Sequence, residues 1–298
     1  MYDIIVNIIN MAIAYTIPLL FATMAGFVSG RSGVINLGLE GMMLSGAFFA
    51  VIGSSISGSA FIGTFAAMLA GGLFGAFHGL GVVVMRINQI VAGIALNMLA
   101  IGTTSLFLSR IFEPYGASYA AASISSFSIG SIKISPFLLL ALVALAGIKF
   151  LLEKTPIGLR LRAAGEDEES ARAFGVRVEM IRFTTLIASG AIAGLAGAYI
   201  SIGEAGFFGG NTISGRGYLA VAIVLCGRNR LFHLMLLALL VGIITALSGW
   251  LHTSIPTIPV QLTQLLPFII VLIMLAGFPR QTRPINEVKS GCLLTNHD

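Results

Sequence analysis

Three polar side chains lie in apolar segments where they could hydrogen-bond a polar solute. Asn36 and Glu40 are four residues apart within Arg31–Met43, and Asn97 lies in the middle of another apolar run. Residues four apart share a face of a helix. Placing a carboxylate among apolar residues costs free energy, so such a residue usually has a functional role. These groups could therefore line a solute pathway. The alternative is structural: Glu40 could bridge neighbouring helices near their cytoplasmic ends, and Asn97 could hydrogen-bond across helices.

A second candidate region combines aromatic and charged residues with many glycines. The segment Gly203–Gly217 is too rich in glycine for a steady helix. It predicts a broken or re-entrant start of a membrane segment near the external surface. Phe207 and Phe208 could stack on an aromatic solute, and Glu204 and Arg216 could contact a partner protein. A plain external loop is the alternative.

The remaining reactive residue types form no recognisable catalytic or metal-binding pattern. No cluster of His, Cys, Asp and Glu has metal-ligand spacing. There is no local Ser/His/Asp arrangement and no Gly-x-x-x-x-Gly-Lys-Ser/Thr loop to hold phosphates. We therefore expect no metal, no resident cofactor and no enzyme activity in this chain.

The composition indicates the kind of protein that must position these residues. The chain has 298 residues, 57% of them hydrophobic and 10% charged, whereas soluble domains carry about 25% charged residues. Twelve of the 29 charged residues lie in Glu153–Arg182, and such a block cannot sit in hydrocarbon. The sequence predicts an all-α transmembrane helix bundle forming a single domain over 1–298, with 153–182 as an aqueous loop.

The order of charges inside this loop predicts a short helix over Glu166–Phe174. Acidic residues stand at its start, Arg172 lies near its end, and Gly175 follows as a candidate stop. This order complements the helix dipole. Ala171 and Phe174, three residues apart, are expected to share a face that could insert into a partner's groove. The alternative is an amphipathic connector resting on lipid headgroups.

Nine apolar segments have about the length needed to cross a bilayer, within a range of eight to ten. They are Ile8–Val28, Val34–Ile56, Phe61–Met85, Ile90–Leu108, Pro136–Leu152, Phe183–Gly203, Gly206–Leu225, Leu231–Trp250 and Gln261–Phe278. With the 153–182 loop in the cytoplasm, only Arg110, Lys133 and Arg216 of the 17 basic residues fall outside, and fourteen fall inside. This predicts a cytoplasmic tail over 279–298 and an external N-terminus. Scattering of basic residues between the spans does not suggest nucleic-acid binding.

Four motifs, in order, resemble those of the permeases of ATP-binding-cassette (ABC) importers in the branched-chain amino acid, ribose and nucleoside permease superfamily. They are Arg31–Met43, Asn88–Asn97, Gly158–Val176 and Ser214–Ile223. The resemblance extends from about Ile13 to Arg280. Asn-x-Gly-x-Glu-Gly-Met in the first motif is similar to the nucleoside-type branch. Sugar and amino-acid members usually have Gly-Gly-x-Asp/Asn-Leu-Ser-x-Gly there.

This resemblance implies one membrane subunit of an ATP-driven importer in the bacterial cytoplasmic (inner) membrane. Its expected partners are a second related permease, a cytoplasmic ATPase that carries ATP and Mg²⁺, an extracytoplasmic binding protein or lipoprotein, and the lipid bilayer. Nucleosides are the expected solutes, with ribose-like sugars or branched-chain amino acids as alternatives. A secondary transporter is a rival from another class. The residues implied to couple to the ATPase are Gly165, Glu166, Ala171, Arg172, Phe174 and Gly175.

Overall fold

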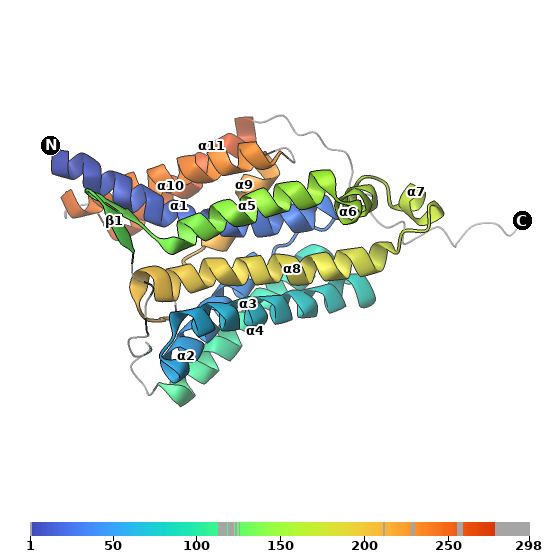
Figure 1. Ribbon diagram of the computed structural model, residues 1–298, viewed down its shortest axis with the longest axis horizontal. Helices are drawn as coiled ribbons and strands as arrows, with labels where there is room; N and C mark the ends of the chain where they lie inside the picture. Colours follow the sequence, from blue (N-terminus) through green and yellow to red (C-terminus); the bar gives the residue numbers. More distant parts are fainter. Residues whose placement is uncertain are drawn as a thin grey trace, which may run out of the picture.

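The protein is a bundle of long apolar helices that run along one common axis (Figure 1). A computed structural model describes residues 2–112, 118, 122, 124, 126–210, 212–227, 230–254 and 259–277. Seven of its helical segments are long and apolar enough to cross a membrane: α1 (Tyr2–Arg31), α2 (Leu39–Ser57), α3 (Ala60–Gly79) with η1 (Leu80–Val84), α4 (Gln89–Ile111), α5 (Pro136–Lys154), α8 (Val178–Ala198) with η2 (Tyr199–Ala205), and α10 (Leu231–Ser254). The prediction of a polytopic all-helical bundle is confirmed.

Two further apolar helices are shorter, so that the number of spans stays a prediction. They are α9 (Arg216–Cys226) and α11 (Val260–Gly277). The short helices α6 (Pro156–Glu166) and α7 (Glu168–Ala173) lie at one end of the bundle, and the chain's N-terminus lies at the other (Figure 1). The predicted tail over 279–298 lies outside the described residues.

A small hairpin lies between the predicted segments Ile90–Leu108 and Pro136–Leu152, and the sequence did not indicate it. Strands β1 (Phe127–Ile129) and β2 (Ile132–Ile134) pair antiparallel around a turn at Gly130. Asn10 of α1 holds this turn, because its side chain donates to the Ser131 carbonyl at 3.0 Å and accepts from the Lys133 N–H at 2.9 Å. The hairpin is thereby fixed to the first helix.

The helices α2, α3 and α8 pack so closely that their backbones touch. A Cβ atom added to Gly71 of α3 would collide with the carbonyl of Gly190 in α8, and one added to Gly190 would collide with the carbonyl of Gly71. Gly194 of α8 meets Ala67 of α3 in the same way, and Gly197 meets Met43 of α2. Small residues allow this close approach in membrane bundles. The three helices therefore form one tightly packed unit.

Two helices begin later than their apolar segments do. The segment predicted from Val34 becomes helical only at Leu39, and the one predicted from Gly206 becomes helical only at Arg216. Residues Ser214 and Gly215 have positive φ values of 52° and 80°, a conformation that no helix can contain. The helix of the seventh segment therefore begins late, which fits both the predicted broken start and the alternative of a plain loop, and the helix of the second segment begins late as well.

Candidate functional site

The charged block folds into two helices rather than one. The short helix predicted from Glu166 to Phe174 is present as α7, but it begins two residues later, at Glu168, because Glu166 ends α6. Asp167 is extended and caps α7: its carboxylate accepts from the N–H groups of Glu169 and Ser170 at 3.1 and 3.2 Å. The Ser170 hydroxyl also donates to it at 2.6 Å. These hydrogen bonds, led by that of the Ser170 side chain, hold the pKa of Asp167 below its usual range.

The end of α7 matches the prediction of a glycine stop. Gly175 has φ +78°, its N–H donates to the Arg172 carbonyl at 2.9 Å, and the Val176 N–H donates to the Ala171 carbonyl at 3.0 Å. This is the Schellman pattern of helix ends. Ala171 is buried whereas Phe174 is 87% exposed, so the prediction that they share one face is wrong. Of these two residues, Phe174 projects outward, because it stands after the last helical turn.

Ion pairs tie α7 to α8 and to the end of α1. Arg172 pairs with Glu168 at 2.8 Å and also with Glu179 in α8. The other carboxylate oxygen of Glu168 lies 2.8 Å from Arg182 of α8, whose Nε donates to the Ser32 carbonyl at 3.2 Å. Burial alone would raise the pKa of Glu168, but the two guanidinium groups lower it below its usual range.

Gly165 completes this assembly, because a Cβ atom there would collide with the carbonyl of Arg31 at the end of α1. We call the structure formed by α6, α7 and their contacts to α1 and α8 the bracket. The bracket contains all six residues predicted for ATPase coupling: Gly165, Glu166, Ala171, Arg172, Phe174 and Gly175.

Glu40 links the two helices that begin late. Its carboxylate oxygens accept from the N–H groups of Gly215 and Gly217 at 2.8 and 2.7 Å. A carboxylate at this place satisfies free N–H groups of α9 and complements its dipole. Asn36 precedes α2 and is not helical, so the predicted shared helix face of Asn36 and Glu40 is wrong.

Asn97 of α4 extends the same network. Its amide nitrogen donates to the Leu37 carbonyl at 3.0 Å and to the Tyr218 hydroxyl at 2.9 Å, and its oxygen accepts from the Gly41 N–H at 2.8 Å. We call these groups, with Glu40 and its two N–H partners, the central joint, because they connect α2, α4 and α9. Both side chains contact neighbouring helices, as the structural alternative describes, but Glu40 does so at the start of α9, which was predicted to lie near the external surface, and not at a predicted cytoplasmic end. Tyr218 lies in the Ser214–Ile223 motif, but its position in the sequence does not indicate its hydrogen bond with Asn97.

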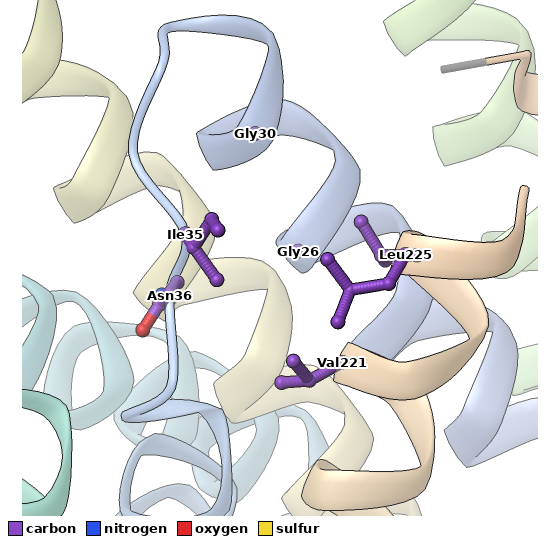
Figure 2. Close-up of a pocket in the computed structure, with 7 residues that line it drawn as sticks. Gly26, Gly30, Ile35, Asn36, Val221 and Leu225 are labelled. Carbon is purple, nitrogen blue, oxygen red and sulfur yellow. The ribbon is translucent and has the colours of Figure 1, made fainter. Parts of the chain in front are cut away.

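Asn36 is held in a separate network on the side of α8. Its amide donates to the Ser189 hydroxyl at 3.0 Å and its oxygen accepts from the Gly38 N–H at 3.0 Å. Figure 2 shows Asn36 beside a cavity of about 30 Å³ between α1 and α9, with its oxygen turned away from Val221 and Leu225 of α9. A cavity of that size holds a water molecule or two. This cavity is therefore too small for a nucleoside or a sugar in this conformation.

A larger hollow lies between η2 and the start of α9. It has a volume of about 400 Å³ and is lined by Ile200, Glu204, Ala205, Phe207, Gly209, Thr212 and Arg216. We call it the η2 hollow. Glu204 and Arg216 face each other across 3.9 Å.

The two phenylalanines predicted to stack on a solute lie in different surroundings. Phe207 lines the η2 hollow and is 47% exposed. Phe208 is fully buried, with its ring 5.2 Å from that of Phe48 and its backbone bonded to Ser118. Only Phe207 is placed to meet a solute. Within the described residues no group of His, Cys, Asp and Glu could hold a metal ion.

Comparison with known proteins assigns the family. The family model for the permease component of branched-chain amino acid transport systems matches residues 4–275. The guanosine ABC transporter permease protein NupQ of Bacillus subtilis (strain 168) is 33% identical over 91% of each chain.

Two further relatives are also ABC transporter permease proteins. The nucleoside ABC transporter permease protein NupC of Lactococcus lactis subsp. cremoris (strain MG1363) is 30% identical, over 92% of this chain and 94% of its own. The putative glucose ABC transporter permease protein TsgC13 of Haloferax volcanii is 30% identical, over 81% of this chain and 77% of its own. No solved structure matches. With a family match over most of its length, the chain belongs to the family of branched-chain amino acid transport system permease components.

Proposed function

We propose that this chain is a membrane-spanning subunit of an ATP-driven importer that carries nucleosides across the bacterial cytoplasmic (inner) membrane. In this proposal it works with a second related permease, a cytoplasmic ATPase and an extracytoplasmic binding protein. ATP and Mg²⁺ belong to the ATPase, and this chain carries no cofactor. Nine spans, an external N-terminus and a cytoplasmic C-terminus complete the proposal.

The observation that carries the proposal is the construction of the bracket. It projects Phe174 from the end of the bundle while Glu168 and Arg182 tie its short helix to α8. Gly165 presses α6 against the end of α1. A partner that pulled on Phe174 would therefore pull on two membrane helices at once. This is what a subunit needs if ATP-driven movements of a partner are to rearrange its spans.

The nucleoside assignment rests on the relatives and on one sequence motif. Two of the similar permeases carry the names guanosine and nucleoside transporter, and the Asn-x-Gly-x-Glu-Gly-Met motif at 36–42 resembles that branch. A sugar is the second candidate, because the putative glucose permease has the same 30% identity as the nucleoside permease NupC, although over a smaller part of both chains.

Uptake by cells tests the substrate. Cells with and without this gene, with the partner genes intact, are given labelled nucleosides, ribose, glucose and leucine. We expect deletion to abolish nucleoside uptake alone and plasmid-borne wild-type protein to restore it. Loss of ribose, glucose or leucine uptake instead would refute the nucleoside assignment but leave the family unaffected.

Substitution in the bracket tests the ATPase partner and separates an importer from a secondary transporter. Phe174→Ala removes an exposed ring without opening a cavity, and Met180→Ala, 54% exposed on α8, is the matched control. We expect Phe174→Ala to reduce co-purification of the ATPase and nucleoside uptake together, with normal membrane insertion. Unchanged uptake after loss of the ATPase would indicate a secondary transporter.

A further inference from the structure

The η2 hollow contains a buried polar group that the fold itself does not satisfy. Nη1 of Arg216 is buried and has no hydrogen-bond partner among the described residues. The facing oxygen of Glu204 lies 3.9 Å away, beyond hydrogen-bonding distance. Buried polar groups are nearly always hydrogen-bonded. Nη1 itself has no exposed surface, so a further molecule in the hollow can meet only the exposed parts of the Arg216 and Glu204 side chains, which are 20% and 33% accessible.

The parts of the hollow are held in position before any solute arrives. The guanidinium group of Arg216 lies 5.3 Å from the centre of the Tyr15 ring, which fixes it by a cation–π contact. Glu40 holds the backbone on either side of Arg216 through the N–H groups of Gly215 and Gly217. Little ordering is then needed on binding, which favours affinity.

Thr212 closes the loop between Phe207 and α9. Its hydroxyl accepts from the Gly209 N–H at 2.8 Å and donates to the Gly209 carbonyl at 2.6 Å. Its only hydroxyl proton is thus used within the loop, so the Thr212 side chain offers no donor to a solute. The aromatic and charged groups that line the hollow are the Phe207 ring and the two charged side chains.

We propose that the η2 hollow holds an uncharged nucleoside during its passage, an inference that rests on the proposed nucleoside function. The Phe207 ring stacks on the base, Arg216 donates to an acceptor on the base or ribose, and Glu204 accepts from an N–H or hydroxyl. The volume of about 400 Å³ lies within the usual range of pockets for small molecules. A flat ring, a donor and an acceptor are all features of nucleosides.

The opposite charges of the hollow determine which nucleoside derivatives it accepts. Arg216 alone would attract a phosphate group, but Glu204 repels it at close range. The hollow therefore favours nucleosides over nucleotides. This selectivity resides in the permease and does not depend on a binding protein.

Photolabelling tests the proposal directly. Membranes that contain the complete permease and ATPase complex, without binding protein, are irradiated with radiolabelled 8-azidoadenosine. We expect the label on the peptide spanning residues 199–216, and we expect excess guanosine or uridine to suppress it while guanosine monophosphate does not. Loss of one base–aromatic stack predicts a decrease in labelling of roughly tenfold in Phe207→Ala. Phe61→Ala, with a ring 81% exposed at the start of α3, controls for the loss of an exposed aromatic side chain.

A gain of binding makes the test sharper. Glu204→Gln removes the repulsion and leaves Arg216 in place, so that guanosine monophosphate should now compete with the label. Arg216→Gln should abolish labelling with or without this change. Failure of the monophosphate to compete in Glu204→Gln would contradict the assigned roles of the two charges.

The possible failures are distinguishable. Normal nucleoside uptake by cells, together with no label on the 199–216 peptide, would refute nucleoside binding in the η2 hollow. The proposed function would be unaffected. Labelling that ribose suppresses and nucleosides do not would instead refute the nucleoside function. Equal labelling in wild type and Phe207→Ala would overturn the stacking role.

Discussion

The bracket and the central joint connect helices by opposite means. In the bracket, Arg172 meets residues four and seven positions away, and these charges are about half exposed to water. In the central joint, Glu40 meets Gly215 across 175 residues of sequence, and the groups are at least partly buried. Water can replace a broken bond in the bracket, but not one in the apolar interior. The contacts of the bracket can therefore break and re-form, whereas the joint fixes how α2, α4 and α9 meet.

The largest effect is expected from Glu40→Leu, which keeps the volume and removes both acceptors. Two N–H groups at the start of α9 lose their partners in an apolar environment, which predicts a destabilisation of about 3–5 kcal/mol. Thermal unfolding of the purified protein in detergent measures it. Glu40→Gln keeps one acceptor oxygen and should lose about half as much. Wild-type stability of Glu40→Leu would show that this carboxylate serves a solute rather than the joint.

Asn97→Leu should rank second, because it removes three hydrogen bonds but no charge. The Gly41 N–H and the Leu37 carbonyl lose their partner, which predicts a loss of about 2–4 kcal/mol by the same unfolding measurement. Tyr218→Phe removes only the bond between Asn97 and Tyr218 and should cost about 1 kcal/mol. If the two variants were equally destabilised, the contacts of Asn97 to α2 would contribute little.

The sequence predicts the bracket better than the central joint, because the ion pairs of Arg172 in the bracket join residues close in the chain and the contacts of the joint join residues far apart in it. The acidic start of α7 and its stop at Gly175 follow from neighbouring residues, so the sequence indicated them. The split at Asp167 does not follow from the sequence, because an acidic residue suits the first turn of a helix as well as its N-cap. Hydropathy likewise predicted the long helices, since the bilayer sets their length.

The contacts of the central joint could not be predicted from spacing. Nothing near Glu40 in the sequence identifies Gly215 and Gly217 as its partners, because the pairing arises only when α2 and α9 pack together. The sequence marked Glu40 and Asn97 as unusual polar residues but left their roles open. Phe207 and Phe208 are adjacent and identical in type, and only the packing against Phe48 separates them.

A smaller effect is expected where the bracket meets α1. Gly165→Ala places a methyl group against the Arg31 carbonyl, so α6 must move away, at about 1–3 kcal/mol. We expect a clear decrease in nucleoside uptake together with only a small decrease in the unfolding temperature. Gly147→Ala in α5 has open space around its added methyl group and should be neutral or slightly stabilising. Full uptake by Gly165→Ala would mean that contact between α6 and α1 is not needed for coupling.

The smallest change in stability is expected for Arg172→Ala. Exposed ion pairs such as those to Glu168 and Glu179 contribute less than about 1 kcal/mol. The substitution should nevertheless loosen α7 and lower the ATPase rate that substrate stimulates in the reconstituted complex. Arg160→Ala, exposed on α6, controls for the loss of one positive charge. If Arg172→Ala lowered the unfolding temperature as much as Glu40→Leu does, the bracket would contribute as much to stability as the central joint, against this prediction.

The distance in sequence between Glu40 and its partners has a consequence for biosynthesis. Gly215 lies 175 residues after Glu40, so at about 5–20 residues per second the ribosome takes roughly 10–35 s to make it. During that time the second helix is inserted without the partner of its carboxylate. A chain released before α9 is made would keep that carboxylate unsatisfied in the bilayer, a defect by which membrane quality control could recognise it.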